Sequence, residues 1–284
     1  MSRSDSSPHL AHPITSLQNP RVKSLVALRK RSERESSHVT LVEGFDEFSF
    51  ALESGVRPLS LYYCPGLIRE KRELSLLGRM RGLGVELVEV SNQVFGRVAY
   101  RETPDGWLAV VPTISTDLSR LRLGATPLIL ICESVEKPGN LGAILRTADA
   151  AGVDAVIASS AVTDWGNPNI IRASKGAIFS VPVAEADTDE LVEWLRAHDI
   201  AIVATTPKTD LSFAAMNLTR GVAIVLGSEK FGVSSTWLEC ADAKVHIPMF
   251  GRVNSLNVAT SAALFTYEVL RQRGRLLGEL RQAI

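Results

Sequence analysis

Apolar residues in the second half of the chain form short runs separated by polar and glycine-rich stretches. The run Leu128–Cys132 is almost continuously apolar, as expected for a strand that is buried on both faces of a sheet. Similar runs predict further strands at Ala155–Ala158, Ala201–Ala204, Val222–Leu226 and Val245–Pro248. The intervening segments predict helices at Leu141–Ala151, Thr188–His198 and Leu256–Arg273. This alternation predicts an α/β domain over residues 127–284.

The first half of the chain predicts a second, smaller α/β domain over residues 14–112. Asn19-Pro20 marks a helix start, because asparagine caps helices and proline suits the first helical position. This helix is predicted to continue to about Arg34. The elements expected after it are strands at His38–Val42, Leu59–Tyr63, Val85–Val90 and Trp107–Val111, with helices near Asp46–Glu53 and Ile68–Arg81.

Polar and low-complexity stretches set the expected domain boundaries. Ser115–Ala125 predicts a connection between the domains, which we place at residues 113–126. Met1–Pro13 is rich in serine, histidine and proline, and we expect it to be disordered. A length of 284 residues also suits two domains, because single cores rarely grow beyond about 250 residues.

Composition excludes several classes of protein. The chain is 45% hydrophobic and 22% charged, which is ordinary for a globular protein. No segment approaches the roughly 18 apolar residues of a membrane span, and the N-terminus lacks the apolar run of a secretory signal. We therefore expect a cytoplasmic protein without a membrane segment. The three cysteines, Cys64, Cys132 and Cys240, lie far apart, so we expect neither a disulfide nor a metal site.

Positive and negative charges balance in the whole chain, but basic residues are concentrated near its N-terminus. The formal net charge is zero, which argues against a protein that coats nucleic acid through bulk charge. The N-terminal helix is nevertheless basic, and its candidates for phosphate contact are Arg21, Lys23, Arg29, Lys30, Arg31 and Arg34. Such a face could bind a nucleic-acid backbone. On charge alone, a solvated helix face explains these residues equally well.

Three predicted loops are dense in glycine and small polar residues: Lys137–Gly142, Leu226–Gly232 and Ile247–Gly251. Each follows a predicted parallel strand, and loops in such positions gather into one ligand crevice. Ser255 and Asn257 precede the last helix, where free amide groups attract a phosphate. The glycine patterns of dinucleotide-binding and P-loop proteins are absent from the sequence. The pattern by itself predicts a ligand-binding α/β domain.

The same loops resemble the motifs of a known family. Asn140–Arg146 resembles the N-x-G-x-[IL]-x-R first motif of the SpoU/TrmH-type RNA 2′-O-ribose methyltransferases of the SPOUT superfamily. Leu226–Glu229 with Gly232 resembles the second motif, and Ile247–Met249 continuing to Ser255–Val258 resembles the third. The three motifs occur in family order, and the resemblance extends over residues 126–272.

The resemblance implies a S-adenosylmethionine-dependent enzyme that methylates a ribose 2′-hydroxyl of RNA. It implies a homodimer whose C-terminal SPOUT α/β domain contains a deep trefoil knot. The positions that match the cofactor-binding residues are Leu226, Gly227, Ile247, Met249, Leu256 and Val258. The positions that match catalytic and substrate-facing residues are Asn140, Arg146, Glu229, Ser255 and Asn257.

The first domain also resembles a part of the family. Ser16–Lys23, Leu41–Gly44 and Thr103–Val110 are similar to segments of a ribosomal-protein-like substrate-binding domain. This similarity favours RNA contact by the basic helix and favours ribosomal RNA over tRNA as the substrate. The chain departs from the usual motifs at Glu133 and Lys137, where many relatives carry aspartate, and at Lys230-Phe231, where smaller residues are frequent.

Within this interpretation Arg146 positions the hydroxyl and a phosphate through its donor fork, with Asn140 and Glu229 orienting it. Because an arginine side chain stays protonated in proteins, the sequence leaves open whether Arg146 also accepts the proton. Phe231 and Phe250 are the aromatic residues near these loops, too few to predict a clamp for a flipped base.

An alternative is a catalytically silent RNA-binding or ribosome-assembly protein of the same fold. A third interpretation, a nicotinamide-dependent oxidoreductase, would need the glycine pattern that the sequence lacks.

Overall fold

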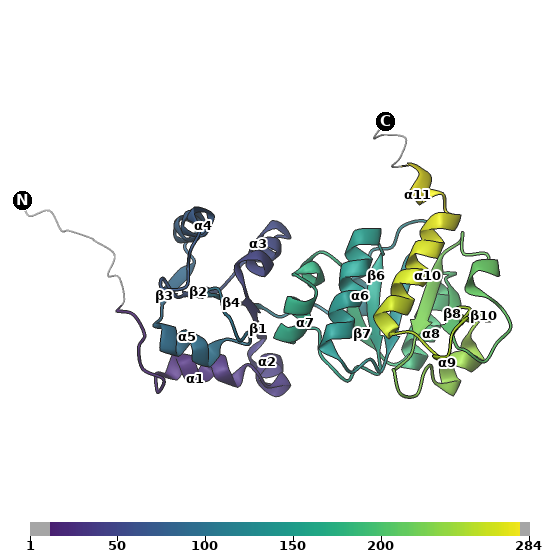
Figure 1. Cartoon of the computed structure of the whole chain (residues 1–284), viewed down its shortest axis with the longest axis horizontal. Coiled ribbons are helices and arrows are strands. Elements are labelled where there is room, and N and C mark those ends of the chain that lie inside the picture. Colours follow the sequence, from purple (N-terminus) through teal and green to yellow (C-terminus); the bar gives the residue numbers. More distant parts are fainter. Residues whose placement is uncertain (1–11, 279–284) are drawn as a thin grey trace, which may run out of the picture. The chain divides into compact units, whose positions relative to one another are not determined.

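The computed structural model describes residues 12–278. Contacts within the chain divide it into two compact units, with the division between Thr113 and Ile114, and each unit is described by itself (Figure 1). The segment Met1–Pro13, which we expected to be disordered, lies outside the described residues except for His12 and Pro13.

The N-terminal unit contains a four-stranded sheet in the order β1-β4-β2-β3. Strand β4 is antiparallel to both β1 and β2, whereas β3 is parallel to β2. The strands are β1 (Val39–Glu43), β2 (Ser60–Tyr63), β3 (Glu86–Glu89) and β4 (Trp107–Pro112). The helices are α1 (Pro20–Ala27), α2 (Arg31–Ser37), α3 (Phe45–Glu53), α4 (Lys71–Gly82) and α5 (Asn92–Val98).

Helices cover both faces of this sheet. Apolar residues of α1 and α5 pack against one face, where Leu108 of β4 belongs to their core. The neighbouring Trp107 points to the other face, because side chains alternate along a strand. There it contacts α3, with the rings of Phe45 and Phe48 centred 5.2 and 5.8 Å from its own. The predicted α/β layers are confirmed for this unit.

The single basic helix predicted from Pro20 to Arg34 is wrong, because the chain forms two helices separated by a turn at residues 28–30. The side chain of Arg34 stabilises this turn. Its guanidinium donates hydrogen bonds to the carbonyl oxygens of Leu28 and Arg29, at 2.8 and 3.0 Å. Arg34 is only 2% exposed, so its proposed contact with RNA is also wrong.

The C-terminal unit contains a six-stranded sheet in the order β10-β8-β9-β5-β6-β7, with every neighbouring pair parallel. The strands are β5 (Leu128–Glu133), β6 (Ala155–Ser159), β7 (Val183–Ala186), β8 (Ala201–Thr205), β9 (Val222–Leu226) and β10 (Ala243–Val245). Every residue of β5, β6 and β9 is buried, as their apolar runs predicted.

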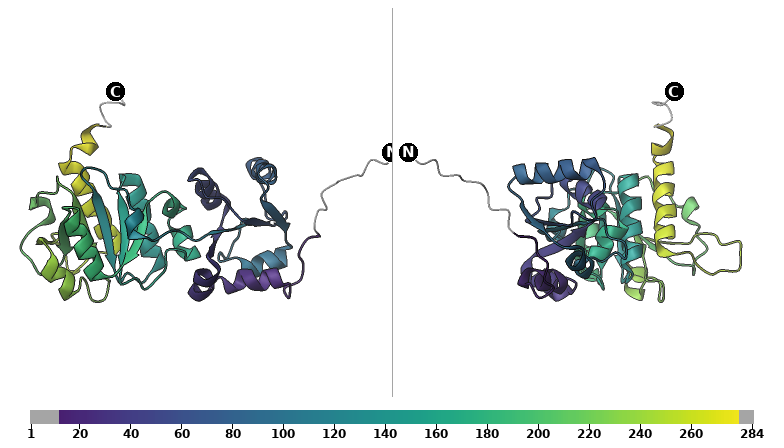
Figure 2. Two further views of the ribbon diagram at one scale, coloured as in Figure 1. Left: turned by 180° about the vertical axis from the view of Figure 1, so that it is seen from behind. Right: turned by 60° about the vertical axis from the view of Figure 1, so that its left-hand side comes forward.

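Two layers of helices enclose this sheet. Helices α6 and α10 lie side by side on one face (Figures 1 and 2), and α8 and α9 pack on the other. Helix α7 lies against α6 so closely that a Cβ on Gly142 would come within 2.4 Å of the Cβ of Ala173. The helices are α6 (Pro138–Ala151), α7 (Pro168–Ala173), α8 (Thr188–Ala197), α9 (Ser235–Cys240), α10 (Val258–Gln272) and α11 (Arg275–Gly278).

The polar segment expected to connect the domains belongs to the C-terminal unit. It contains the short 3₁₀ helix η1 (Leu118–Arg120), whose Leu118 is 7% exposed and joins the core beneath α8. The carbonyl of Thr116 also accepts a hydrogen bond from the Glu185 amide of β7 at 3.0 Å. Two further 3₁₀ turns are η2 (Ala177–Phe179) and η3 (Phe213–Ala215). None of the helices described here is long and apolar enough to cross a membrane.

Candidate active site

The three loops singled out in the sequence leave the same edge of the parallel sheet. Strands β5 and β9 are neighbours, with Cys132 opposite Leu226, and β10 lies beyond β8 on the same side. The strand order reverses direction between β5 and β9, since the chain runs outward from β5 to β7 and then crosses to β8. Ligands of open α/β sheets bind at such a point, beyond the carboxyl ends of the strands.

Side chains from all three loops meet there in one hydrogen-bonded cluster. The Nδ2 of Asn140, in the first turn of α6, donates to Oε1 of Glu229 at 3.1 Å. The Nδ2 of Asn257 donates to the same Oε1 at 3.0 Å and to Oδ1 of Asn140 at 3.1 Å. Asn257 is itself fixed as the N-cap of α10, because its Oδ1 accepts from the Ala259 amide at 3.0 Å. Residues 89 and 28 positions from Glu229 thus converge on its carboxylate.

The Glu229 carboxylate is held in its charged form. Lys137 forms a salt bridge with its Oε2, and this contact, followed by the hydrogen bond from Asn140, lowers the pKa of Glu229 below its usual value. The partner of Lys137 was not predictable from the sequence, because the pairing spans 92 residues. Lys137, where the sequence departs from the motif it resembles, is therefore a member of the cluster.

A tight turn carries Glu229. The amide of Gly232 donates to the Ser228 carbonyl at 2.9 Å, and the amide of Phe231 donates to Ser228 Oγ at 3.1 Å. A Cβ on Gly227 would lie 2.0 Å from the carbonyl carbon of Gly232, so only glycine fits where the turn folds back. The buried Glu133, at the end of β5, holds the end of the loop by accepting from the Ser234 amide at 2.8 Å.

The third loop has the properties of a cofactor cradle. Among the described residues, no backbone amide from Ile247 to Leu256 donates a hydrogen bond to another residue. Ile247, Met249 and Leu256 are half-buried, while Leu226 and Val258 beside them are buried. Unpaired backbone groups between apolar side chains fit the edge and face of a purine, which needs both hydrogen bonds and apolar contact. The residues present therefore fit an adenosyl group.

Arg146 and Ser255 lie outside the hydrogen-bonded cluster. Arg146 is exposed on α6, next to the buried Leu145. Within residues 12–278, the side chains of Arg146 and Ser255 form no hydrogen bond or ion pair. The polar atoms of Asn140 and Glu229 are directed at Asn257, Lys137 and each other, so the predicted orientation of Arg146 by these two residues is not observed. All the N–H donors of the Arg146 guanidinium are therefore available to a ligand.

The basic residues of the N-terminal unit differ in how far they are free to bind. Arg21 pairs with Glu86 at 2.7 Å and Arg31 pairs with Glu35 at 2.6 Å. Arg29 donates to the carbonyl oxygens of Arg97 and Ala99 and lies over the Tyr100 ring. Lys23 and Lys30 are exposed, with no partner among the residues that the structure describes.

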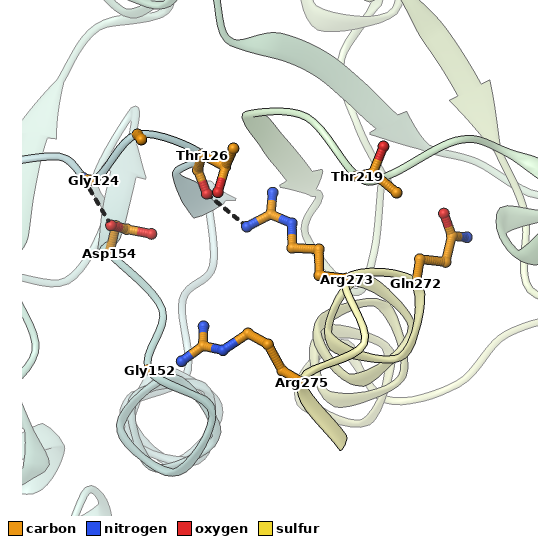
Figure 3. Close-up of a pocket in the computed structure, with 9 residues that line it drawn as sticks. Gly124, Thr126, Gly152, Asp154, Thr219, Gln272, Arg273 and Arg275 are labelled. Carbon is orange, nitrogen blue, oxygen red and sulfur yellow. Dashed lines mark hydrogen bonds between the residues drawn. The ribbon is translucent and has the colours of Figure 1, made fainter. Parts of the chain in front are cut away.

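A second recess occupies the opposite edge of the C-terminal sheet (Figure 3). It has a volume of about 760 Å³. Its lining consists of Gly124, Ala125, Thr126, Gly152, Asp154, Thr219, Gln272, Arg273 and Arg275, and none of them belongs to the three motif loops. Elsewhere in the described part of the chain, no group of three or more histidine, cysteine, aspartate or glutamate residues is placed to hold a metal ion.

Two family models match separate parts of the chain. The model of the SpoU rRNA methylase family matches residues 127–267, which contain all three loops. The model of the MRM3-like substrate binding domain matches residues 19–109, which lie in the N-terminal unit.

Similar proteins extend over nearly the whole chain. The 23S rRNA (guanosine(2553)-2′-O)-methyltransferase of Bacillus subtilis is 29% identical, covering 90% of this chain and 98% of its own. The 23S rRNA (uridine(2479)-2′-O)-methyltransferase of Streptomyces viridochromogenes is 30% identical, covering 93% of each. The structure of the SpoU methyltransferase AviRb from Streptomyces viridochromogenes with the cofactor AdoMet matches with a TM-score of 0.83 and 29% identity, covering 90% of this chain and 98% of that one.

Proposed function

The chain belongs to the SpoU rRNA methylase family, and we propose that it transfers a methyl group from S-adenosylmethionine to a ribose 2′-hydroxyl of ribosomal RNA. The observation that carries this proposal is the cluster of Asn140, Glu229 and Asn257. It joins the three motif loops at the switch point of the sheet. A catalytically silent protein of the same fold has no need to keep all three side chains in mutual hydrogen bonds.

S-adenosylmethionine supplies a methyl carbon that is already electrophilic because the neighbouring sulfur is positively charged. The segment from Ile247 to Leu256 would hold the cofactor through its unpaired backbone groups, with Leu226, Gly227 and Val258 completing the cradle. Similar structures contain this cofactor. The protein's remaining task is to align the hydroxyl oxygen with the methyl carbon and to relieve it of its proton.

The exposed Arg146 is suited to that alignment. Its guanidinium has no partner within residues 12–278, so its five N–H donors are available for the target hydroxyl and an adjacent phosphate. Asn257 and the neighbouring Ser255, at the start of α10, would help to bind the phosphate. The ionised Glu229 is held by Lys137 and Asn140, and it would orient the polar groups around the ribose rather than act as a strong base, since its pKa is lowered.

The N-terminal unit would bind the RNA around the target. The exposed Lys23 and Lys30 are its foremost candidates for phosphate contact, while Arg21, Arg29 and Arg31 would have to exchange or share the partners they have. The buried Arg34 is excluded. Matches to methyltransferases of 23S rRNA favour ribosomal RNA as the substrate, and such a substrate is consistent with the cytoplasmic location expected from the sequence.

We also propose that the protein is a homodimer with the knotted topology of its family. Support for the dimer comes from large apolar side chains on the outer surface of α10. Leu264 and Tyr267 of that helix are 40% and 44% exposed, although its opposite side packs against α6. Sedimentation at micromolar concentration tests the dimer, and a monomeric species with full activity would contradict it.

The proposed activity is tested by the chemistry of the product. Alkaline cleavage of RNA requires a free 2′-hydroxyl, so ribose methylation leaves a dinucleotide that resists alkali. Ribosomal RNA from cells lacking this gene is incubated with the protein and methyl-tritiated S-adenosylmethionine, then hydrolysed. We expect the label in alkali-resistant dinucleotides. Label in ordinary mononucleotides would show base methylation, and absence of label would favour the silent RNA-binding protein.

A further inference from the structure

Next to the hydrogen-bonded cluster, one aromatic side chain is held out in solvent. Phe231 is 78% exposed, although a buried phenylalanine would stabilise the fold by about 1.5–3 kcal/mol. It stands two positions after Glu229 on the same turn. The exposure of this ring therefore needs an explanation.

The backbone that carries Phe231 is fixed. Its own amide donates to Ser228 Oγ at 3.1 Å, and Ser228 forms an antiparallel bridge with Gly232. Gly227 closes the turn with no room for a Cβ. Because the turn is fixed, little backbone entropy would be lost when a ligand contacts the ring. Phe250, which is 99% exposed, differs because it lies in the segment whose backbone amides make no hydrogen bonds.

One lysine lies over the ring. The Nζ of Lys230 is 4.8 Å from the centroid of Phe231. An ammonium over one face leaves the opposite face of a 78% exposed ring accessible. An aromatic face beside a lysine is an arrangement with which proteins bind single-stranded RNA, where bases stack on rings and lysines contact phosphates.

We propose that Phe231 is a stacking platform for an unpaired nucleobase of the RNA, one that lies next to the methylated ribose, and that Lys230 binds the phosphate of the same nucleotide. This inference rests on the proposed function. It assigns Phe231 and Lys230 to substrate recognition. The target base itself has no aromatic clamp, so the subsite selects RNA in which the base next to the methylated ribose is unpaired.

The test compares Phe231→Ala, Phe231→Trp and Lys230→Ala in the full-length protein. The substrate is ribosomal RNA from cells lacking this gene, and the measurements are KM for RNA, RNA affinity at several salt concentrations, and affinity for S-adenosylmethionine. Stacking on an aromatic side chain predicts that Phe231→Ala raises KM by about 5-fold to 100-fold. Phe231→Trp should restore KM to within about 2-fold, because indole keeps the stacking face.

Salt separates the two roles. Phe231→Ala should leave the slope of log affinity against log salt concentration unchanged. Lys230→Ala should make this slope shallower, by the amount expected when one phosphate contact is lost. Both variants should bind the cofactor as the parent does. The matched control is Leu276→Ala, which removes another exposed apolar side chain, 38% accessible and in α11 of the C-terminal unit, outside the motif loops. It should leave KM unchanged.

Three results would overturn the inference while the parent protein still methylates ribosomal RNA: an unchanged KM in Phe231→Ala, no rescue by tryptophan, or a change from dimer to monomer on sedimentation. The last would place the ring in a subunit interface. Failure of the parent protein to methylate this RNA would instead reject the proposed function itself.

Discussion

The two edges of the six-stranded sheet use polar side chains in opposite ways. At the carboxyl edge, Asn140, Glu229 and Asn257 bind one another. At the amino edge, Arg273 at the end of α10 spreads its guanidinium over the carbonyl oxygens of four residues. These acceptors are Thr126 at 2.6 Å, Arg220 at 2.6 Å, Pro127 at 3.2 Å and Leu218 at 3.3 Å.

The partners decide what each edge can do. A backbone carbonyl cannot move without its strand, so Arg273 fixes the starts of β5 and β9 against α10. Asp154 does the same with the amides of Gly124 and Leu128, at 3.2 and 2.8 Å. Apart from the cap that Asn257 places on the Ala259 amide, the contacts of the carboxyl-edge cluster join side chains to side chains, and these contacts can exchange when a ligand arrives. The 760 Å³ recess at the amino edge is therefore framed by structural contacts, whereas the functional groups gather at the carboxyl edge.

The largest effect expected from this comparison is the loss of activity in Arg146→Ala. The side chain is exposed and binds nothing within residues 12–278, so its removal should leave the fold intact. Loss of a donor aimed at the reacting groups costs about 100-fold to 1,000-fold in kcat. Cofactor affinity should stay within a few-fold, because other loops form the cradle. Arg146→Lys keeps the charge without the fork and should recover little activity; a fully active Arg146→Ala enzyme would refute the assignment.

Arg273→Met should have the reverse effect, lowering stability while sparing the chemistry. Methionine keeps the apolar stem but removes the guanidinium donor from four carbonyl oxygens, of which Pro127 keeps the Val222 amide; this should lower the free energy of unfolding by about 2 kcal/mol. Urea denaturation measures this loss, and kcat per folded molecule should stay near the parent value. Arg271→Met is the matched control, because the exposed Arg271 pairs with Glu268 of the same helix, and its unfolding midpoint should change much less than that of Arg273→Met.

Sequence reasoning was accurate where burial is uniform. Strands β5 and β9 were predicted with nearly correct ends because all their residues are buried. It missed β7, a short edge strand that contains Glu185, and α9, whose six residues begin after the cap Ser234. The family motifs located Asn140, Glu229 and Asn257 in the sequence. That Lys137 binds Glu229 could not be predicted, because the contact depends on how distant loops meet.

Asn140→Ala should reduce kcat by about 10-fold, a smaller effect than loss of Arg146, because Glu229 keeps its contacts with Lys137 and Asn257. Asn140→Asp is the sharper variant. It has nearly the same shape, but it replaces the donor facing Glu229 Oε1 with a second negative charge at 3.1 Å, so the two carboxylates repel each other. Its kcat should be lower than that of Asn140→Ala. Equal activities would mean that the cluster acts through packing alone.

The smallest expected effect is a difference between the two edges in how the stability of the fold depends on pH. The pKa of Glu229 lies below its ordinary value of 4.5, first because of Lys137 and then because of Asn140. The unfolded chain therefore takes up the proton at higher pH than the folded protein does. The ionised carboxylate stabilises the fold above about pH 4.5, and this contribution is lost as the pH falls through the lower folded-state value.

Glu229→Gln should therefore flatten the acid end of the stability curve and change little at pH 7, because exposed charge pairs contribute little. Urea denaturation of the parent and the variant between pH 7 and pH 3 measures the difference. Arg273→Met provides the contrast, because its guanidinium stays charged throughout this range. Its loss should lower the curve by a similar amount at every pH. If Glu229→Gln gave that uniform shift instead, the carboxylate would be stabilising the fold as Arg273 does, and the two edges would not differ in the way the contacts indicate.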